Sequence, residues 1–405
     1  MRQTFRKALA LTLCLCLVGA LAACGKKETN TPDPSPSAQP TQTVEADFLP
    51  DNKIDVAEKL LGFPGDTALF TVNGQPVDAE EYLYWLGNMT SYYQMMMAYS
   101  GGSLNLDDQL TDTMTWDQQL KEIAYQNSVL MAVTPAVAAE YGVTLSGDDV
   151  AAVLQQRESN IQNAGGEEQY AHQLQAMGIN DSTAYRLDTV STLFTNLQDK
   201  YTQLAMEEGN AESITAQEMA DYLKEQDLLR AKHILFKTVD DDRQPYDDET
   251  IAQKKAQAED VLAQLKADPA KFDELMNEYS EDTGLATNPD GYLFGAGQMV
   301  EEFENGTRAL AVGEISGIVE SVWGYHIIQR LDADCDESRQ EYATQKFNDM
   351  MNERIESAVV EKMEEYDSFT TKDYYEPLLE FQDSLEQPDT TDKSNATLEP
   401  QTTAP

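Results

Sequence analysis

The fold of this chain is decided by two short stretches, AKHILFK (Ala231 to Lys237) and WGYHIIQR (Trp323 to Arg330). Each sets a histidine in an otherwise apolar run of aromatic and aliphatic residues, which is typical of a β-strand. They hold His233 and His326, two of the three histidines in the sequence, about ninety residues apart. Two strands that each carry an imidazole within one domain-sized interval indicate a small catalytic domain.

The interval between these strands predicts a compact α+β unit of about one hundred residues. After an acidic loop and a first helix, a second helix starts behind Asp268 with Pro269 in its first turn. YSED (Tyr279 to Asp282) and GQMVEEFE (Gly297 to Glu304) add a carboxylate and large apolar side chains. The remaining predicted elements are a short helix from about Val300 to Leu310 and strands near Ile318 and from Tyr325 to Leu331.

The region before this unit predicts a mainly helical domain. ALFTVNGQPV (Ala68 to Val77) is interpreted as a strand broken by an Asn-Gly turn, and Asp78 caps the helix that follows. A second helix starts near Trp116, and Pro135 is expected to break or kink it before a stop at Gly142. Further helices are predicted at Gly147 to Asn163, Glu167 to Met177, Ser182 to Met206, and from a capping box at Thr215 to about Gln226.

The region after the unit predicts one more helix, from Ser338 to about Asp367, with a single apolar stripe. Such a helix needs a partner. We expect that partner in the helical region before the unit, which makes the outer domain discontinuous in sequence.

The first residues predict a secretory signal at 1–23, because three basic residues precede an uncharged apolar run. The run ends in Leu21-Ala22-Ala23-Cys24-Gly25, which resembles the lipobox of bacterial lipoproteins. We therefore expect Cys24 to carry a lipid anchor that holds the protein at the extracytoplasmic face of the bacterial cell membrane. Secretion with a free Cys24 is the alternative. Residues 24–46 and 385–405 have the composition of a disordered tether and tail.

The charge of the chain excludes one class of partner. Removal of residues 1–23 leaves 25 basic residues against 72 acidic ones, a net charge of −47. Such a chain repels nucleic acid, which is therefore excluded as a ligand. Besides Cys24, only Cys335 would remain, so no intramolecular disulfide is predicted. The acidic neighbours of Cys335 disfavour a reactive thiolate.

Residues 229–332 resemble the parvulin family of peptidyl-prolyl isomerases. The resemblance rests on the ordered motifs AKHILFK, YSED, GQMVEEFE, GEIS (Gly313 to Ser316) and GYHIIQR. With the lipobox and the helical flanks, including VNGQPVDAEEY, the whole chain resembles PrsA-type extracellular foldases, relatives of the SurA-type periplasmic chaperones. The implied fold is α+β, with a small domain (228–332) of four antiparallel strands and helices. It is inserted in a mainly helical chaperone-like domain (47–227), on which a C-terminal helical segment (333–384) packs.

The resemblance also implies an active site without cofactor or metal. Its polar centre would be a hydrogen-bonded array, and an apolar cradle would hold the proline ring. The implied residues are His233, Asp282, Ser321 and His326 for the centre, and Leu293, Met299 and Phe303 for the cradle. Catalysis would lower the rotational barrier of an X-Pro bond, about 18–20 kcal/mol, by disfavouring amide resonance. The partners would be unfolded or partly folded secreted polypeptides that contain X-Pro bonds.

Two departures from the family pattern concern substrate contacts. Many parvulins have a Gly-Gly-Asp-Leu-Gly turn, where this chain has NPDGYL (Asn288 to Leu293), one residue shorter before Phe294. The loop after the first strand carries a cluster of acidic residues (Asp240 to Glu249), where phosphate-directed parvulins are basic. This predicts basic or neutral residues near the substrate proline rather than phosphoproteins.

Three other interpretations stay open. Each site residue can be structural, as a strand histidine often is when a neighbour satisfies it. The protein can be a holding chaperone with a silent isomerase site, which uses Met89 and Met95 to Met97 as adaptable contacts. Finally, His233, Asp282 and His326 have the ligand types of a two-histidine, one-carboxylate iron site. The third histidine, His172, is interpreted as an ordinary surface residue.

Overall fold

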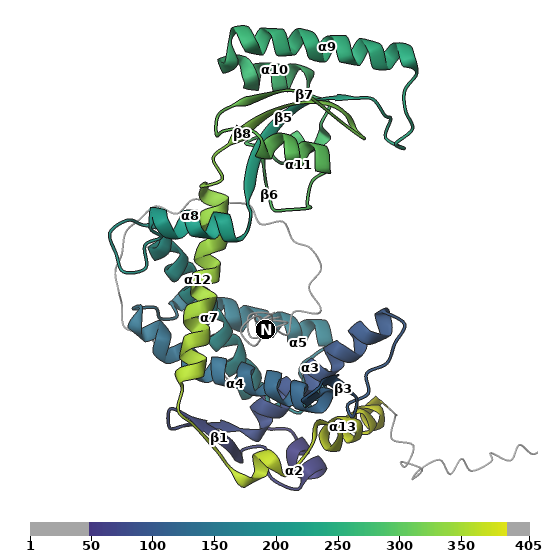
Figure 1. Ribbon diagram of the computed structural model, residues 1–405. Coiled ribbons are helices and arrows are strands. Elements are labelled where there is room, and N and C mark those ends of the chain that lie inside the picture. The colour runs from purple at the N-terminus through teal and green to yellow at the C-terminus, as the bar shows by residue number, and fades with distance from the viewer. Residues whose placement is uncertain (1–47, 387–405) are drawn as a thin grey trace, which may run out of the picture. The chain divides into compact units, whose positions relative to one another are not determined.

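The computed structural model (Figure 1) describes residues 48–386. The predicted signal, the tether and the lipidation site Cys24 lie outside the described residues, as do residues 387–405 of the predicted tail. Leu385 and Glu386, where the tail was expected to begin, instead complete a helix. None of the helices between residues 48 and 386 combines the length and the apolar character that a membrane span requires.

The described chain divides into two units, residues 48–200 with 348–386, and residues 201–347. The unit that contains both strand histidines is thus inserted in sequence between the two segments of the other. This unit is wider than the predicted catalytic domain, 228–332. The boundaries of that domain therefore remain a prediction.

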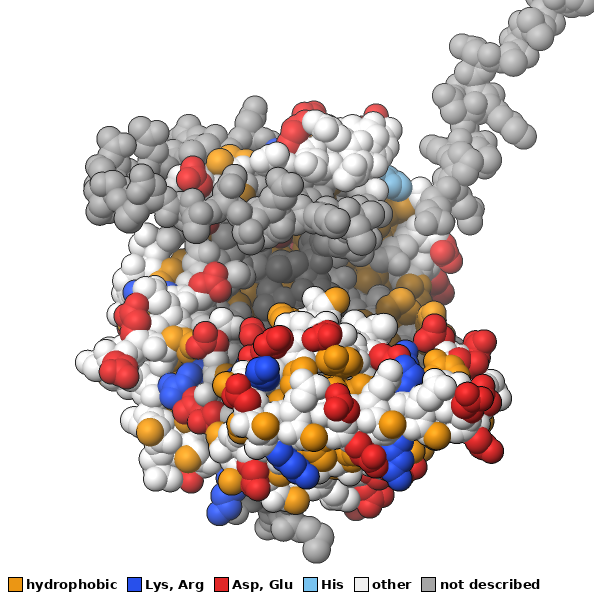
Figure 2. Space-filling view, turned by 90° about the horizontal axis from the view of Figure 1, so that it is seen from above, with side chains coloured by type: hydrophobic (Ala, Val, Ile, Leu, Met, Phe, Trp, Pro, Cys, Tyr) orange, Lys and Arg blue, Asp and Glu red, His pale blue; other side chains and the backbone are white. Residues whose placement is uncertain are grey.

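The surface carries the acidic character of the sequence. The chain has a formal net charge of −44. In the face that Figure 2 shows, acidic side chains are spread throughout, with basic side chains more sparsely placed and small hydrophobic areas between them. Such a surface favours solubility and attracts cationic partners.

The first unit combines helices with a three-stranded sheet of order β2-β1-β9. β1 (Ala68–Val72) and β2 (Gln75–Asp78) form a hairpin across the predicted Asn-Gly turn, and Asn73 and Gly74 both adopt positive φ, 50° and 80°. The Asp78 carboxylate then accepts a hydrogen bond from the Glu81 N–H and starts α3. The other elements are α2 (Val56–Leu61), α3 (Ala79–Tyr99), β3 (Gln109–Thr111), β4 (Met114–Thr115), α4 (Trp116–Glu140), α5 (Gly147–Ala164), α6 (Glu167–Met177) and most of α7 (Asp181–Met206).

Pro135 does not break α4, contrary to one of the two predicted outcomes. The helix continues to Glu140, and Gly142 follows with φ 67°. Val133 and Val137 are both buried, so the apolar face of α4 is covered on either side of the proline. Burial of this face offsets the one backbone hydrogen bond that proline cannot donate.

The predicted single helix from Ser338 to Asp367 is wrong beyond Ser357. α12 (Asp336–Ser357) ends there, and β9 (Val360–Lys362) pairs antiparallel with β1, with Val72 opposite Val360. In this segment, hydrogen bonds to the open edge of β1 replace helical hydrogen bonds. A helical pattern in the local sequence cannot reveal a strand partner so far away. A short 3₁₀ turn (Glu364–Asp367) and α13 (Thr371–Glu386) follow, and α13 contacts α2, α3, α4 and α6 of the same unit.

The second unit contains a four-stranded antiparallel sheet of order β6-β5-β8-β7. This confirms the predicted α+β fold class. The strands are β5 (Leu229–Lys237), β6 (Tyr292–Phe294), β7 (Ile315–Ser321) and β8 (Gly324–Leu331). The helices of the domain are α8 (Ala216–Glu225), α9 (Asp248–Ala267), α10 (Phe272–Tyr279) and α11 (Glu301–Arg308), with 3₁₀ turns at Pro269–Lys271 and Thr283–Ala286.

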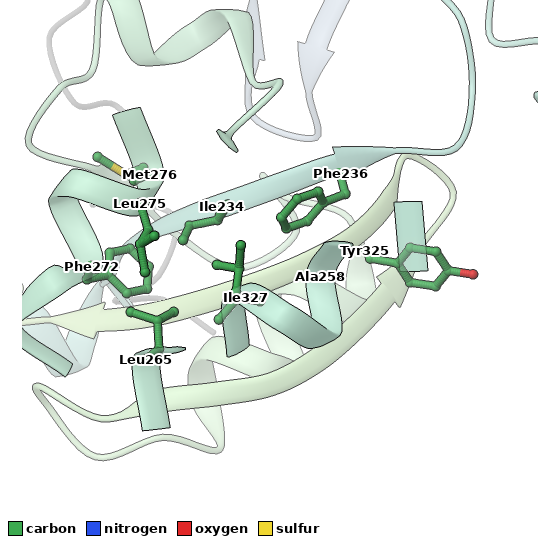
Figure 3. Packing of buried hydrophobic residues seen from close by; sticks show 10 residues of the cluster. Ile234, Phe236, Ala258, Leu265, Phe272, Leu275, Met276, Tyr325 and Ile327 are labelled. Carbon is green, nitrogen blue, oxygen red and sulfur yellow. The ribbon is translucent and has the colours of Figure 1, made fainter. Parts of the chain in front are cut away.

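Strand alternation gives this sheet two different apolar faces. On one face, Ile234 and Phe236 of β5 and Ile327 of β8 pack against α9 and α10, where Figure 3 shows them beside Leu265 and Phe272. The other face carries a second cluster next to α11. Its buried members are Leu229, Ala231, Phe294, Phe303 and Ile328. The histidines of β5 and β8 alternate with the first set and therefore lie on the α11 face.

We predict that Gly324→Ala destabilises the second unit by about 3 kcal/mol. Gly324 has φ 141°, and a Cβ there would lie 2.1 Å from the backbone oxygen of Phe236 on the paired strand. The matched control is Gly313→Ala, which also has positive φ (85°) but no atom within 4 Å of its Cβ position, so about 1 kcal/mol is expected. Thermal or urea unfolding measures both, and equal losses would contradict the proposed steric cause.

Candidate active site

The structure brings all four predicted polar residues into one hydrogen-bonded line. His233 Nδ1 lies 2.9 Å from His326 Nδ1. At one end, His233 Nε2 lies 2.8 Å from Asp282 Oδ2, and at the other, Ser321 Oγ lies 2.7 Å from His326 Nε2. Both imidazoles are buried, at 7 % and 3 % exposure. Two histidines 93 residues apart therefore share one direct contact.

The register between β5 and β8 makes this contact possible. His233 pairs with Ile328, and Leu235 pairs with His326. The two histidines are thus diagonal neighbours on one face of adjacent strands, within reach of each other's side chains. Ser321 ends β7, one strand further, and pairs with Gly324. A shift of either strand by one residue would move its histidine to the other face.

The YSED segment carries Asp282 to the end of this line. The Leu235 N–H donates to Ser280 Oγ at 3.1 Å, and the Glu281 N–H donates to the Leu235 carbonyl oxygen at 2.8 Å. The chain leaving α10 is therefore tied to the edge of β5. Asp282 follows Glu281 directly, and its carboxylate contacts His233, which lies on β5 like Leu235.

Three donors converge on the Asp282 carboxylate. Besides His233, the Tyr292 hydroxyl donates to Oδ2 at 2.6 Å and the Gly284 N–H donates to Oδ1 at 2.9 Å. Burial raises the pKa of Asp282, but these hydrogen bonds outweigh burial and hold the pKa well below its usual range. Burial, together with the same contact to Asp282, raises the pKa of Tyr292 well above its usual value. Asp282 is thus an anion and Tyr292 a neutral donor.

When both imidazoles are uncharged, only one placement of their protons satisfies all hydrogen bonds of this line. Burial, helped by the neighbouring His233, lowers the pKa of His326 to about 3, so this ring is neutral. Because the Asp282 carboxylate only accepts, His233 Nε2 carries a proton and its Nδ1 accepts from His326 Nδ1. His326 Nε2 is then free to accept from the Ser321 hydroxyl. The Trp323 N–H completes the line by donating to Ser321 Oγ at 3.1 Å.

Of the three predicted cradle residues, Phe303 lies beside this line and Met299 packs against the same apolar cluster as Phe303. The Phe303 ring centroid is 5.0 Å from that of His233 and 5.6 Å from that of His326. Met299 is partly buried against the same apolar cluster, next to Phe294 and Phe303. An aromatic ring therefore borders the polar line directly, and the role of these side chains as a cradle remains a prediction.

The register of the sheet does not bring Leu293, the third predicted cradle residue, beside this line. The register of β6 on β5 pairs Tyr292 with Ala231 and Leu293 with Arg230. Paired residues share a face, so Tyr292 lies on the histidine face and Leu293 on the α9 and α10 face. The turn before β6 is one residue shorter than the family pattern, and one residue exchanges the two faces of a strand.

Tyr292 is the site residue that the sequence interpretation missed. One signal was available, since Phe294 is an obvious core residue and Tyr292 stands two positions before it. Residues with that spacing in a strand share a face. This spacing puts Tyr292 on the face of Phe294, but both faces of the sheet are apolar, so the sequence does not say that this is the face of the histidines.

The iron-site interpretation finds no support in this geometry. The ring nitrogens of His233 point at His326 and Asp282, not toward a shared open position. Among residues 48–386, no group of three or more His, Cys, Asp or Glu side chains is arranged to hold a metal ion. His172 is exposed on α6, and Cys335 is partly buried at the start of α12.

Comparison with known families gives a match to the segment that contains this site. A family model described as "Rotamase: PPIC-type PPIASE domain" matches residues 233–332, from the first histidine of the line to the end of the sheet. The inserted α+β segment is therefore a peptidyl-prolyl isomerase domain of the parvulin type.

The chain is also similar to curated proteins named "Foldase protein PrsA". It is 37 % identical over 108 residues to that of Staphylococcus aureus (strain bovine RF122 / ET3-1), a match that covers 26 % of this chain and 32 % of the relative. The same protein of strain Newman gives the same identity and coverage. The chain thus spans about a third of the length of these relatives. The resemblance to parvulin-type, PrsA-like foldases is confirmed for this part of the chain.

Solved structures give a looser match. The parvuline NmPin of Nitrosopumilus maritimus is 31 % identical and covers 26 % of this chain and 96 % of its own, with a TM-score of 0.20. PrsA from Bacillus subtilis is 18 % identical and covers 70 % of this chain and 93 % of its own, with a TM-score of 0.24. Superpositions this loose add nothing to the family match and the site geometry.

We predict that His326→Gln flattens the acid dependence of stability. The pKa of His326 is lower in the folded protein than its ordinary 6.5, so the unfolded chain takes up the proton first as the pH falls. The contribution is complete above about pH 6.5 and is lost toward pH 3, with a slope of up to about 1.4 kcal/mol per pH unit. Urea unfolding between pH 7 and pH 4 measures the slope.

The matched control for this experiment is His172→Gln, which removes an exposed imidazole of the first unit. It is expected to retain the wild-type slope. A His326→Gln protein with the wild-type slope would show that the buried imidazole is not the source of the acid sensitivity.

Proposed function

We propose that this protein is a peptidyl-prolyl cis-trans isomerase and foldase that assists the folding of secreted polypeptides outside the cytoplasmic membrane. The observation that carries the proposal is the line Ser321, His326, His233 and Asp282 beside Phe303. It lies within the segment that matches the rotamase model.

The proposed chemistry needs no bond to be made or broken. A planar amide places partial negative charge on its carbonyl oxygen, and this charge decreases as the C–N bond twists. Apolar walls such as Phe303 and Met299 stabilise the planar, charge-separated form less than water does. An anion near the carbonyl oxygen, which Asp282 supplies, also disfavours the planar form. Both effects lower the barrier to rotation.

The polar line fits a role in shaping the site. Each ring nitrogen of His233 and His326 already has a hydrogen-bond partner. The Asp282 carboxylate is held by three donors and its side chain is only 18 % exposed. Such groups offer the substrate a fixed arrangement of charge rather than a mobile proton.

The proposed substrates are X-Pro segments with basic or neutral neighbours. The loop after β5 carries exposed acidic residues, among them Asp241 and Asp242. With a net charge of −44, the chain repels acidic segments and attracts basic ones. Secreted polypeptides that are still unfolded expose their X-Pro bonds and are the proposed partners.

The proposed location is the extracytoplasmic face of the bacterial cell membrane. Its support is the sequence alone, since the signal-like run and Cys24 belong to the residues that the structure does not describe. An acidic protein on a lipid anchor stays near the membrane while anionic headgroups repel its surface.

We predict that Asp282→Ala lowers kcat/KM for isomerisation of an X-Pro model peptide about tenfold to a hundredfold, because it removes the charged acceptor of three hydrogen bonds. Met299→Ala, which removes apolar contact beside the site, is expected to cost about tenfold. The matched control is Asp273→Ala on α10, a 67 % exposed carboxylate that pairs with Lys232. The control should keep the wild-type rate.

Equal, slow rates for the wild type and both site variants would contradict the isomerase proposal. They would leave the second candidate function, a holding chaperone. A specific observation favours that candidate, because Met95, Met96 and Tyr99 at the end of α3 are 58 %, 48 % and 94 % exposed. Flexible thioether side chains suit contacts with varied apolar segments. In that case suppression of client aggregation would persist in the Asp282→Ala protein.

We predict that Cys24→Ser abolishes lipid labelling. Wild-type protein produced in a bacterium supplied with radiolabelled palmitate should carry the label and sediment with membranes. The Cys24→Ser protein should lack the label and appear in the soluble fraction. Cys335→Ser is the control and should behave as the wild type, and label retained in Cys24→Ser would contradict the proposed anchor.

A further inference from the structure

The hydroxyl and the ring of Tyr292 both contact residues of the polar line. Its hydroxyl shares Asp282 Oδ2 with His233 Nε2, at 2.6 and 2.8 Å. Its ring centroid lies 6.0 Å from that of His233. The tyrosine therefore contacts both the carboxylate and the imidazole that the carboxylate holds.

Gly284 leaves room for this hydroxyl. A Cβ at Gly284 would lie 2.2 Å from the Tyr292 hydroxyl oxygen and 3.3 Å from the Cζ atom that bears it. The same glycine donates its N–H to Asp282 Oδ1. One residue thus binds the carboxylate and keeps space for a second donor to it.

Gly291 comes directly before β6, the strand that carries Tyr292, and lies close to the backbone of β5. It has φ 94°, and a Cβ there would lie 2.7 Å from the backbone oxygen of Ala231. A glycine at this position lets β6 begin directly against β5, where Tyr292 pairs with Ala231. The two glycines on either side of the loop are thus matched to this one tyrosine.

We propose that Tyr292 is a positioning residue of the active site. Its hydroxyl donates to Asp282 at the end of the line and holds this carboxylate in the orientation that accepts from His233. The proposal rests on the proposed isomerase function. With donors on both carboxylate oxygens, Asp282 cannot rotate about its side chain without breaking a hydrogen bond. The carboxylate in turn fixes which nitrogen of each imidazole carries a proton.

The surroundings of Asp282 show which groups determine its charge. The titratable groups that face it are His233 on β5 and Tyr292 on β6, with His326 on β8 behind His233. The adjacent Glu281 carboxylate turns instead to Lys254 of α9 and to the backbone N–H of Lys237. Loss of the Tyr292 hydroxyl therefore removes one of three donors without a substitute.

The first test is Tyr292→Phe in the full chain, which keeps the ring and removes only the hydroxyl. We expect kcat for an X-Pro model peptide to fall about tenfold while KM stays within about twofold, because the apolar walls remain. In ¹³C NMR, the carboxyl resonance of Asp282, assigned with Asp282→Asn, should titrate at a higher pH than in the wild type, because one hydrogen-bond donor to the ionised form is lost. Tyr279→Phe, on the opposite face of the sheet, is the matched control and should change neither quantity.

The second test is a double-mutant cycle on thermal stability, which does not depend on isomerase activity. Gly284→Ala alone should lower Tm by roughly 5 °C, because the new Cβ collides with the Tyr292 hydroxyl. In the Tyr292→Phe background the collision is absent, so Gly284→Ala should cost much less there.

The outcomes separate this proposal from the proposed function. An unchanged Asp282 titration in Tyr292→Phe, or additive effects in the cycle, would overturn the positioning role even if the protein is an active isomerase. A shifted titration with a non-additive cycle supports the role even if no isomerisation is detected, in which case only the proposed function fails. A fall in kcat without a shift in the titration would also count against the role.

Discussion

The antiparallel register of β5 on β8 is the constraint on which the site depends. It places His233 and His326 on one face as diagonal neighbours, and every other contact of the polar line is built outward from their 2.9 Å contact. The same alternation sends Ile234 and Ile327 to the opposite face, into the core with α9 and α10. One strand pairing therefore contributes both to the core of the domain and to the geometry of its site.

The electrostatics of the line follow from burial at its centre and hydrogen bonding at its acid end. Burial makes the charged form of His326 unfavourable, so the middle of the line is neutral. Asp282 is also partly buried, yet three donors keep it ionised. A fixed carboxylate charge beside the neutral His326 ring and aromatic walls suits a reaction that redistributes charge within an amide and transfers no proton.

Much of this architecture could be predicted because it is encoded locally. The hairpin at Asn73 and Gly74, the cap at Asp78 and the capping box at Thr215 depend on residues within a few positions of one another. The predictions that failed concern segments whose structure depends on residues far away in the sequence. The helix expected to continue beyond Ser357 yields to strand pairing with β1, about 290 residues earlier in the chain. Helical periodicity carries no information about such a distant partner.

Four of the residues that form the polar line could be identified from the sequence, because histidines in apolar strands, a carboxylate after a helix and a serine near the last strand are visible as ordered motifs. Only the tertiary structure decided how they meet. The register of β6 on β5 pairs Tyr292 with Ala231 and so puts Tyr292, not Leu293, on the face of the histidines. A strand's two faces differ by a single residue of register, and packing across the sheet, not local preference, selects between them.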